Sequence, residues 1–171
     1  MTKIQTDIPR QEIHIEGITF TAADARLASD GGPSRLQHLF SEDKSGFKSS
    51  LADFLAEWFN ETDTVKVHTS GSTGTPKELW VEKRRMMESA RLTVNFLDLQ
   101  PKDTALLCMP LQYIAGKMVV VRSLVASLNL LPVAPCSRPL QYLETAPDFA
   151  AMVPLQVYSS IQNPRDKELL C

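Results

Sequence analysis

The stretch TSGSTGTPK, residues 69–77, decides the fold that we expect for this chain. Glycines let the backbone approach a ligand closely, so that successive N–H groups can point into one concavity and hold anionic oxygens. Serine and threonine hydroxyls add donors, and the closing lysine adds a positive charge on a long side chain. These residue types suit a polyphosphate. A polar surface turn is the plainer alternative, but nine such residues in a row exceed what a turn needs.

The segments on either side of this stretch are expected to be strands. Residues 64–68 alternate apolar and polar side chains, and residues 78–81 form a short β-prone run. A Walker-type P-loop needs Gly-x-x-x-x-Gly-Lys-Ser/Thr followed by a helix. Counting from Gly71, the pattern here is Gly-x-x-Gly-x-Pro-Lys. We therefore predict a loop that joins the two strands of a hairpin.

Residues 69–77 resemble the first signature of the adenylate-forming superfamily, which contains acyl-CoA synthetases, luciferases and the adenylation domains of peptide synthetases. Every fixed position of that signature, Thr-Ser-Gly-Ser/Thr-Thr-Gly-x-Pro-Lys, is matched. The resemblance implies that the loop holds the β- and γ-phosphates of ATP while a carboxylate attacks the α-phosphate. The implied ATP phosphate-binding residues are Thr69, Ser70, Gly71, Ser72, Thr73, Gly74, Thr75 and Lys77.

A second stretch, PLQYIAG at residues 110–116, resembles the conserved block near the acyl pocket of the same superfamily. The resemblance implies an acyl-substrate region made of Gln112, Tyr113, Gly116 and Lys117. The superfamily usually has an aromatic residue or a histidine near Gln112 and Tyr113, so the acyl preference stays open. Lys117 and Arg122 could reach an anionic acyl carboxylate, but a solvated helix face is the more ordinary role for both.

The rest of the sequence predicts helices that alternate with strands. Period-two alternation around Gly17 indicates a small hairpin over residues 12–20, and an apolar stripe indicates a helix over residues 47–59. Further helices are expected over 86–97, 114–128 and 155–161, and further strands over 104–109, 130–133 and 149–153. The expected fold class is α/β. It is the N-terminal portion of an adenylate-forming large domain, in which a small hairpin and helices precede a β-α-β-α-β unit with a parallel sheet, doubly wound and covered on both faces.

Composition narrows the class of protein. The chain has 171 residues, of which 43% are hydrophobic and 22% charged, as in a globular domain with a core. A formal net charge of −2 argues against nucleic acid or an anionic membrane as a partner. The apolar runs are too short to span a bilayer, and residues 1–10 lack the apolar core of a signal peptide. Three widely spaced cysteines favour a reducing cytoplasm.

No catalytic residue and no metal site is expected within this chain. The spacing offers neither a Ser-His-Asp nor a Cys-His arrangement, and the acidic residues do not cluster as metal ligands. Of the three histidines only His68, directly before the loop, is placed to touch a ligand. The basic cluster at residues 83–85 is expected to be a solvated helix start.

Members of the superfamily are several times longer than this chain. A Tyr-Gly-x-Thr-Glu block, a ribose-binding aspartate and a mobile C-terminal domain with a catalytic lysine are typical of them and have no counterpart in residues 1–171. We therefore expect residues 1–171 to be a partial N-terminal AMP-binding (adenylation) domain without the C-terminal subdomain. Such a chain, whether a truncated or a naturally shortened product, is expected to be inactive alone.

The resemblance implies that the parent enzyme is an acid–CoA ligase, which uses ATP, Mg and CoA to adenylate a small-molecule carboxylate and then form a thioester. Only 68 residues precede the signature, and residues 122–124 read Arg-Ser-Leu, as in o-succinylbenzoate–CoA ligases of menaquinone biosynthesis. A synthetase for another acid and a non-catalytic nucleotide- or acyl-binding module are the alternatives. An unrelated phosphate-binding hydrolase would need a nucleophile and a base that the spacing does not offer. The oligomeric state is not predicted by the sequence.

Overall fold

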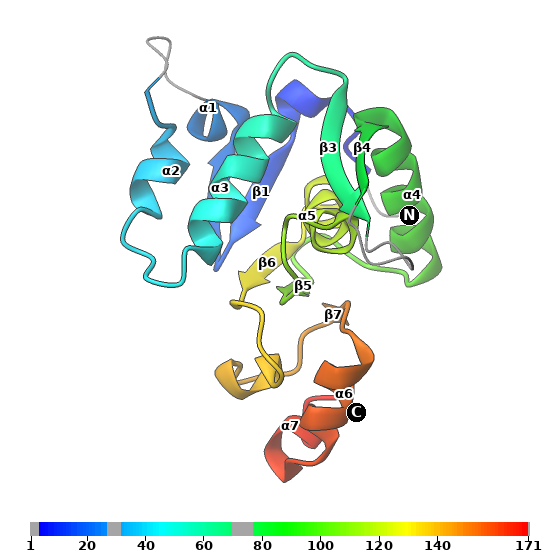
Figure 1. Ribbon diagram of the computed structural model, residues 1–171. Coiled ribbons are helices and arrows are strands. Elements are labelled where there is room, and N and C mark those ends of the chain that lie inside the picture. The colour runs from blue at the N-terminus through cyan, green and yellow to red at the C-terminus, as the bar shows by residue number, and fades with distance from the viewer. Residues whose placement is uncertain (1–3, 27–31, 70–76, 171) are drawn as a thin grey trace.

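The computed structural model describes residues 4–26, 32–69 and 77–170 (Figure 1). In this part of the chain, a five-stranded sheet has the order β2-β1-β6-β5-β7, and β3 and β4 form a sheet of their own. The strands are β1 (Glu12–Ile15), β2 (Ile18–Thr21), β3 (Thr64–Thr69), β4 (Lys77–Glu82), β5 (Thr104–Leu107), β6 (Asn129–Pro132) and β7 (Phe149–Ala150). The helices are α1 (Ala22–Ala25), α2 (Arg35–Leu39), α3 (Phe47–Trp58), α4 (Lys83–Phe96), α5 (Ile114–Ala126), α6 (Pro154–Ile161) and α7 (Pro164–Glu168), with short 3-10 turns at η1 (Ile8–Arg10) and η2 (Pro139–Tyr142).

The N-terminal hairpin forms where the sequence predicts it. β1 and β2 pair antiparallel from Glu12↔Thr21 to Ile15↔Ile18. The turn between them places Glu16 at φ +51° and Gly17 at φ +82°, in the left-handed region where glycine is favoured. β1 then pairs parallel with β6, so this hairpin forms one edge of the larger sheet.

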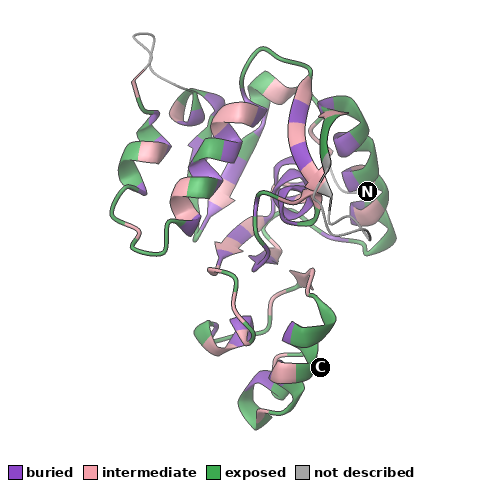
Figure 2. Cartoon of the chain, viewed as in Figure 1, coloured by how far each residue is buried: buried purple, intermediate pink, exposed green. Residues whose placement is uncertain are grey.

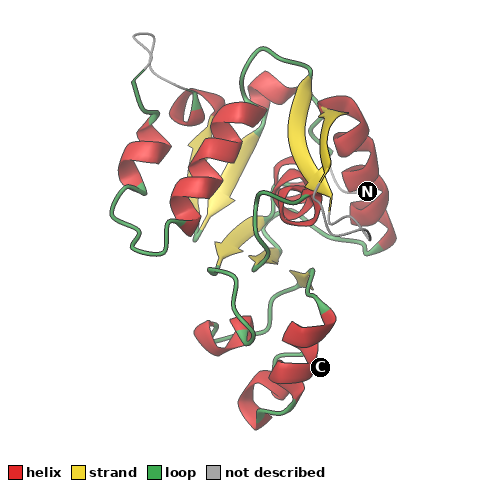
Figure 3. Ribbon diagram, in the orientation of Figure 1, coloured by secondary structure: helices red, strands yellow, loops and turns green. Residues whose placement is uncertain are grey.

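The larger sheet confirms the predicted α/β class with a parallel sheet. The pairs β1–β6, β6–β5 and β5–β7 are all parallel, and α5 connects β5 to β6 (Figure 3). Along β5 the side chains alternate between two apolar clusters. Ala105 and Leu107 belong to the main core with α3, α4 and α5, whereas Leu106 and Cys108 pack with Leu140 and Leu143. Both faces of β5 are therefore buried, as a central parallel strand requires.

β4 pairs with β3, as predicted, and in the described part of the chain it does not join the parallel sheet. β4 exposes Leu79 by 46% and Trp80 by 66%. A parallel strand is buried on both faces, so these side chains favour a two-stranded hairpin outside the sheet. The connection from β6 to β7 contains η2 instead of a helix of several turns.

The helices bury the predicted stripes. All six residues of the stripe predicted in the 47–59 segment are buried, namely Phe47, Leu51, Phe54, Leu55, Trp58 and Phe59. In α4, Met86, Ala90 and Val94 are buried, while Leu97, which lies past the end of the helix, is exposed. Figure 2 shows that most of α5 is buried, because the sheet, α4 and the β3–β4 hairpin pack against it. Among the described residues, no helix is both long and apolar enough to cross a membrane.

The short helix α2 was missed, although the sequence contains its signal. Ser34 accepts a hydrogen bond from the N–H of Gln37 (3.1 Å), and the Gln37 side chain accepts one from the N–H of Ser34 (2.8 Å). This reciprocal pair is the capping box of Ser-x-x-Gln sequences. The motif at residues 34–37 would have predicted the helix start.

Candidate functional site

The β3–β4 hairpin confirms the two strands predicted around the glycine-rich stretch. The strands pair antiparallel from Thr64↔Glu82 to Thr69↔Lys77. Thr69 and Lys77 are therefore the facing ends of the hairpin. The other predicted phosphate-binding residues, Ser70, Gly71, Ser72, Thr73, Gly74 and Thr75, lie outside the described residues.

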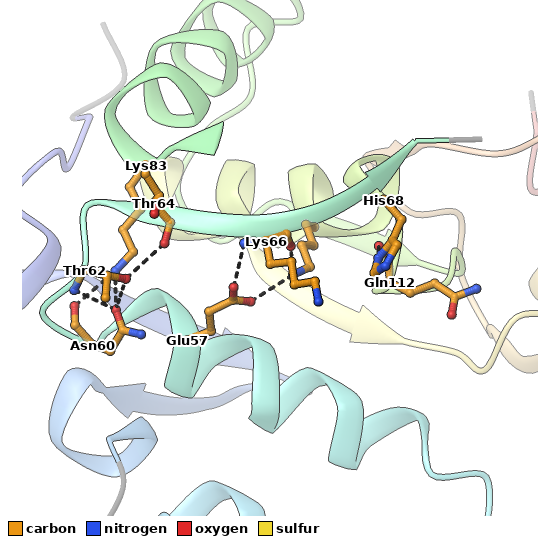
Figure 4. A network of polar contacts seen from close by, with 9 residues as sticks. Glu57, Asn60, Thr62, Thr64, Lys66, His68, Lys83 and Gln112 are labelled. Carbon is orange, nitrogen blue, oxygen red and sulfur yellow. Dashed lines mark hydrogen bonds and ion pairs between the residues drawn. The ribbon is translucent and has the colours of Figure 1, made fainter. Parts of the chain in front are cut away.

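The loop end of β3 is joined to the second sequence block. The N–H of His68 donates a hydrogen bond to the carbonyl oxygen of Gln112 (3.1 Å), and His68 forms a parallel bridge with Tyr113. The His68 ring turns the same way, with Nδ1 lying 3.2 Å from the Gln112 carbonyl oxygen (Figure 4). The structure thus brings Gln112 and Tyr113, predicted from the acyl block, next to the strand that leads into the predicted phosphate loop.

A second set of polar contacts links the two strands of the hairpin near the loop. Glu78 Oε1 lies 2.7 Å from Lys66 Nζ and 3.2 Å from His68 Nε2. The hydrogen bond from Lys66, with a smaller contribution from His68, holds the pKa of Glu78 below its usual value despite some opposing desolvation. The residue that follows Lys77 is therefore a carboxylate at neutral pH, engaged by side chains of β3 and not directed at a phosphate.

Gly116 is required by the packing of the second block. A Cβ atom at this position would lie 2.6 Å from the Pro110 carbonyl oxygen and 2.8 Å from that of Met109. Such distances are far inside van der Waals contact with backbone that cannot move aside cheaply. The same turn is closed by a hydrogen bond from the Tyr113 N–H to the Pro110 oxygen (3.3 Å). Gly116 therefore shapes the segment that carries Gln112 and Tyr113.

Lys117 does not lie on a solvated helix face, so that expectation is wrong. Its side chain is only 9% exposed, because most of α5, including Lys117, is buried. The ammonium donates to Glu57 Oε2 (2.9 Å) and to the carbonyl oxygen of Lys66 (2.6 Å), and it lies 4.9 Å from the centre of the Phe54 ring. A cavity of about 220 Å³ adjoins these groups and is lined by Ser50, Asp53, Phe54, Glu57, Leu111, Gln112 and Lys117.

The basic cluster at residues 83–85 is also not uniformly solvated. Arg84 and Arg85 are exposed, but Lys83 is only 3% exposed. Its ammonium donates to the carbonyl oxygen of Asn60 (3.1 Å) and to Asn60 Oδ1 (2.9 Å), as Figure 4 shows. Burial lowers the pKa of Lys83, and the charges of Glu57 and Asp63 oppose this shift. The hydrogen bonds from Lys83 to Asn60 therefore join the start of α4 to the segment between α3 and β3.

Arg122 has an incomplete set of partners. The residue is half-buried, and its guanidinium carbon lies 5.7 Å from the centre of the Phe149 ring. Its Nε is buried and makes no hydrogen bond within the described part of the chain. Burial lowers the pKa of Arg122. A buried polar atom without a partner is costly, and Ser160 Oγ and Asp166 Oδ1 are the other such atoms among the described side chains.

The described residues offer no metal centre, and the thiol of Cys108 is not reactive. Within residues 4–26, 32–69 and 77–170, no group of three or more His, Cys, Asp or Glu side chains could hold a metal ion. Cys108 is buried, and desolvation raises the pKa of its thiol to about 12, with a small contribution from Cys136. A thiol with such a pKa stays protonated at neutral pH and is a poor nucleophile.

Comparison with solved structures decides the fold. The chain is similar to an acyl-CoA synthetase (AMP-forming)/AMP-acid ligase II-like protein from Dyadobacter fermentans, with 34% identity and a TM-score of 0.67 over 73% of this chain and 36% of that one. This chain has the fold of the N-terminal domain of adenylate-forming enzymes. The likeness supports membership of the adenylate-forming superfamily, as the match of residues 69–77 to the signature implied.

Two further solved structures are similar to this chain over part of their length. The inhibitor-bound N-terminal domain of FACL13 from Mycobacterium tuberculosis is 21% identical, with a TM-score of 0.51 over 68% of this chain and 33% of that one, and shows likeness of fold alone. MenE from E. coli with bound OSB-AMS is 24% identical, with a TM-score of 0.47 over 56% of this chain and 21% of that one. The adenylate-forming fold is thus matched over only part of each relative. No protein-family model matches the sequence, and no curated protein matches it.

Sequence reasoning missed Glu57 at this site. Its carboxylate accepts hydrogen bonds from the Lys66 N–H (2.7 Å) and from the Lys117 ammonium. Nothing in the helical pattern of residues 47–59 separates Glu57 from other polar residues of that helix. Its partners lie on β3 and α5, and only the folded chain brings these three elements together.

Proposed function

We propose that this chain is the N-terminal, phosphate-binding part of a cytoplasmic ATP-dependent acid–CoA ligase. The observation that carries the proposal is the hydrogen bond from His68 to Gln112, which joins the end of β3, where the TSGSTGTPK stretch begins, to the second block. In such a ligase the substrate carboxylate attacks the α-phosphate of ATP and displaces pyrophosphate. The thiol of CoA then attacks the acyl carbon and displaces AMP, which leaves a thioester.

The residues of this chain would contribute binding and positioning. Residues 69–77 would hold the outer phosphates through backbone N–H groups, hydroxyls and the Lys77 ammonium. Gln112 and Tyr113 would form a wall of the acyl site, since they lie beside the end of β3, and Gly116 would shape the segment that carries them. Fixed donors and neutralised charge account for most of the catalysis of phosphoryl chemistry. Magnesium would accompany ATP, but the described residues include no ligand set for it, so we derive no step through the ion.

For the acyl substrate we propose o-succinylbenzoate, which would place the enzyme in menaquinone biosynthesis. Arg122 supports an acid with a second carboxylate, because its buried Nε lacks an acceptor in the described part of the chain. A guanidinium binds a carboxylate through charge-assisted hydrogen bonds that a neutral group cannot replace. The neighbouring Phe149 ring would supply an apolar contact for an aromatic acid. A synthetase for another acid is the alternative.

A pyrophosphate-release assay on the complete ligase tests the substrate. The expected result is a preference for o-succinylbenzoate over acetate and over a long-chain fatty acid. Arg122→Met should raise KM for the dicarboxylate more than KM for a monocarboxylate. Arg91→Met, which removes an exposed pair with Glu88 on α4, is the matched control. Comparable rates with a fatty acid would refute the substrate and leave the superfamily intact.

We also propose that the 171 residues alone do not catalyse the ligase reaction. The loop accounts only for the outer phosphates, whereas adenine, ribose and the attacking carboxylate need further binding groups to be oriented for reaction. ATP should therefore bind weakly to this chain in a calorimetric titration. The alternative is a non-catalytic nucleotide- or acyl-binding module that kept the loop. Tight binding of ATP or of an acyl group by the isolated chain, without turnover, would favour that module.

A further inference from the structure

The outer edge of β3 is completed by side chains and not by a strand. In the described part of the chain, β4 is the neighbour of β3 on one side, and no strand lies beside Lys66 on the other. Nevertheless, both backbone groups of Lys66 are bonded on that side. Its N–H donates to Glu57 Oε1 (2.7 Å), and its carbonyl oxygen accepts from Lys117 Nζ (2.6 Å). A carboxylate and an ammonium thus replace the acceptor and donor of a neighbouring strand (Figure 4).

The two side chains that make these bonds are paired with each other. Glu57 Oε2 lies 2.9 Å from Lys117 Nζ, and the side chains are 26% and 9% exposed. Buried charges are stabilised only where they are both paired and hydrogen-bonded. Glu57 and Lys117 each make one bond to the other and one to the backbone of Lys66. In this register of β3, both charges are therefore paired and hydrogen-bonded. Sliding β3 by one residue would direct the Lys66 backbone groups toward β4 and leave both charges incompletely bonded.

The pair lies close to the proposed site. Two residues after Lys66, the N–H of His68 donates to the Gln112 carbonyl oxygen, and Thr69 ends the strand. We call the ion pair of Glu57 and Lys117, with its two hydrogen bonds to Lys66, the clamp. Three residues of strand span about 10 Å, so the clamp acts within about 10 Å of the predicted phosphate loop. Lys117 itself belongs to the helix that follows Gln112 and Tyr113. One side chain therefore touches both the phosphate-loop strand and the helix that leads out of the acyl block.

We propose that Glu57 and Lys117 are positioning residues, which hold β3 in register against Gln112 and Tyr113 and so fix the separation of the phosphate loop from the acyl block. The ion pair serves as a substitute for a strand at Lys66. Its consequence for catalysis rests on the proposed function, whereas its consequence for β3 does not. Lys117 acts on ATP through β3, and the acyl carboxylate is bound by other groups.

Amide hydrogen exchange in the 171-residue chain tests the clamp without any substrate. Lys117→Met keeps most of the apolar stem and removes the charge. Lys117→Met should speed amide exchange at Lys66 and His68 by at least about tenfold. In this variant the outer edge of β3 can open to water without breaking an ion pair. Exchange at Leu106 and Leu130, in the central sheet, should not change. Unchanged exchange at Lys66 would overturn the proposal.

Matched variants separate the clamp from general loss of stability. Lys48→Met removes an exposed pair with Glu16 that also involves α3, with Nζ and Oε2 2.6 Å apart, and should leave exchange at Lys66 as in the wild type. Lys117→Arg retains a cation and should recover most of the protection. If Lys117→Met does not fold, Glu57→Gln provides the test, since an amide still accepts from Lys66 N–H but no longer pairs with Lys117. Equal protection in Glu57→Gln and wild type would then contradict the proposal.

Kinetics of the complete ligase test the consequence for catalysis. Lys117→Met should raise KM for ATP and lower kcat while KM for the acid stays unchanged, and Lys117→Arg should restore part of both values. A rise in KM for the acid instead would show that Lys117 binds the acyl carboxylate, and unchanged kinetics would show that the clamp does not position the site. If the wild type forms no acyl-adenylate with any acid, the proposed function fails, while the exchange data still decide the clamp.

Discussion

The N–H of His68 donates to the carbonyl oxygen of Gln112 across 3.1 Å, and this bond joins residues that are 44 positions apart in the chain. His68 directly precedes the strand end at Thr69, and Gln112 directly precedes the N-terminal cap of α5 at Tyr113. The hairpin that carries the glycine-rich stretch is thereby fixed to the segment that leads into the most buried helix. Two stretches that were assigned to phosphate and acyl binding on sequence alone become neighbours.

The close approach at Gly116 gives the first prediction. Replacing glycine by alanine within an exposed helix usually stabilises the helix by about 1 kcal/mol. At Gly116 the sign should reverse, and Gly116→Ala should lower the free energy of unfolding by about 1–3 kcal/mol, because the added Cβ would overlap the carbonyl oxygens of Pro110 and Met109. Urea denaturation followed by circular dichroism measures the change. Ala115→Ser at the neighbouring exposed position should have little effect. Equal stability of Gly116→Ala and wild type would mean that the turn at 109–110 relaxes freely.

Lys83 gives a prediction for alkaline pH. Desolvation places the folded-state pKa of this lysine below its ordinary value of 10.5. Between these two pKa values the unfolded chain binds more protons at this site, so the contribution of Lys83 to folding stability rises with pH. Lys83→Met removes that contribution. The stability of the wild type relative to Lys83→Met should therefore increase as pH rises toward 10.5.

The control for this experiment is a variant of a lysine that the solvent reaches. Lys44→Met is suitable, because Lys44 lies in the segment between α2 and α3 and not at a helix start. The stability difference between the wild type and Lys44→Met, measured over the same pH range, gives the effect of removing a lysine charge at an exposed position. If the stability difference between the wild type and Lys83→Met did not change with pH, this would contradict a desolvated ammonium at the start of α4.

Asp148 gives a prediction for acid pH. Its carboxylate accepts hydrogen bonds from the N–H of Thr104 (2.7 Å) and from the Thr104 hydroxyl (2.8 Å), which joins the start of β7 to the start of β5. The bond from the backbone of Thr104, followed by that from its hydroxyl, lowers the pKa of Asp148 below 3.8. The stabilisation is present above that pH and is lost as pH falls through the lowered value. Asp148→Asn should lower the free energy of unfolding by less than about 1 kcal/mol, since the group is exposed, and the difference should vanish in stronger acid.

Glu42→Gln, at an exposed carboxylate, serves as the control for Asp148→Asn. If Asp148→Asn lowered the stability by the same amount in strong acid, ionisation of Asp148 would contribute nothing to the stability.

The elements that sequence reasoning located are those set by local pattern. Alternation before Thr69 and around Gly17 predicted the two hairpins, and the spacing of apolar residues in 47–59 predicted α3. Each of these patterns buries one face of one element, so it can be identified without knowledge of the partner. The approximate position of the candidate site followed from the two motifs in the same way.

The features that sequence reasoning missed depend on contacts between distant elements. Lys83 and Lys117 have the composition of solvated residues, but each is buried because a carbonyl oxygen and a second acceptor meet its ammonium, at Asn60 in one case and at Lys66 and Glu57 in the other. A basic residue is assigned to the surface by default, since burial without such partners is prohibitive.

We propose above all that residues 69–77 hold the outer phosphates of ATP for an acid–CoA ligase. It is tested most directly by measuring acyl-adenylate formation in the complete ligase with and without Lys77→Ala. Loss of one preorganised cation at developing charge typically costs about hundredfold or more in rate, so we predict a decrease of that size with an unchanged circular dichroism spectrum. Unchanged acyl-adenylate formation in Lys77→Ala, or acyl-adenylate above background from the 171-residue chain alone, would contradict the account.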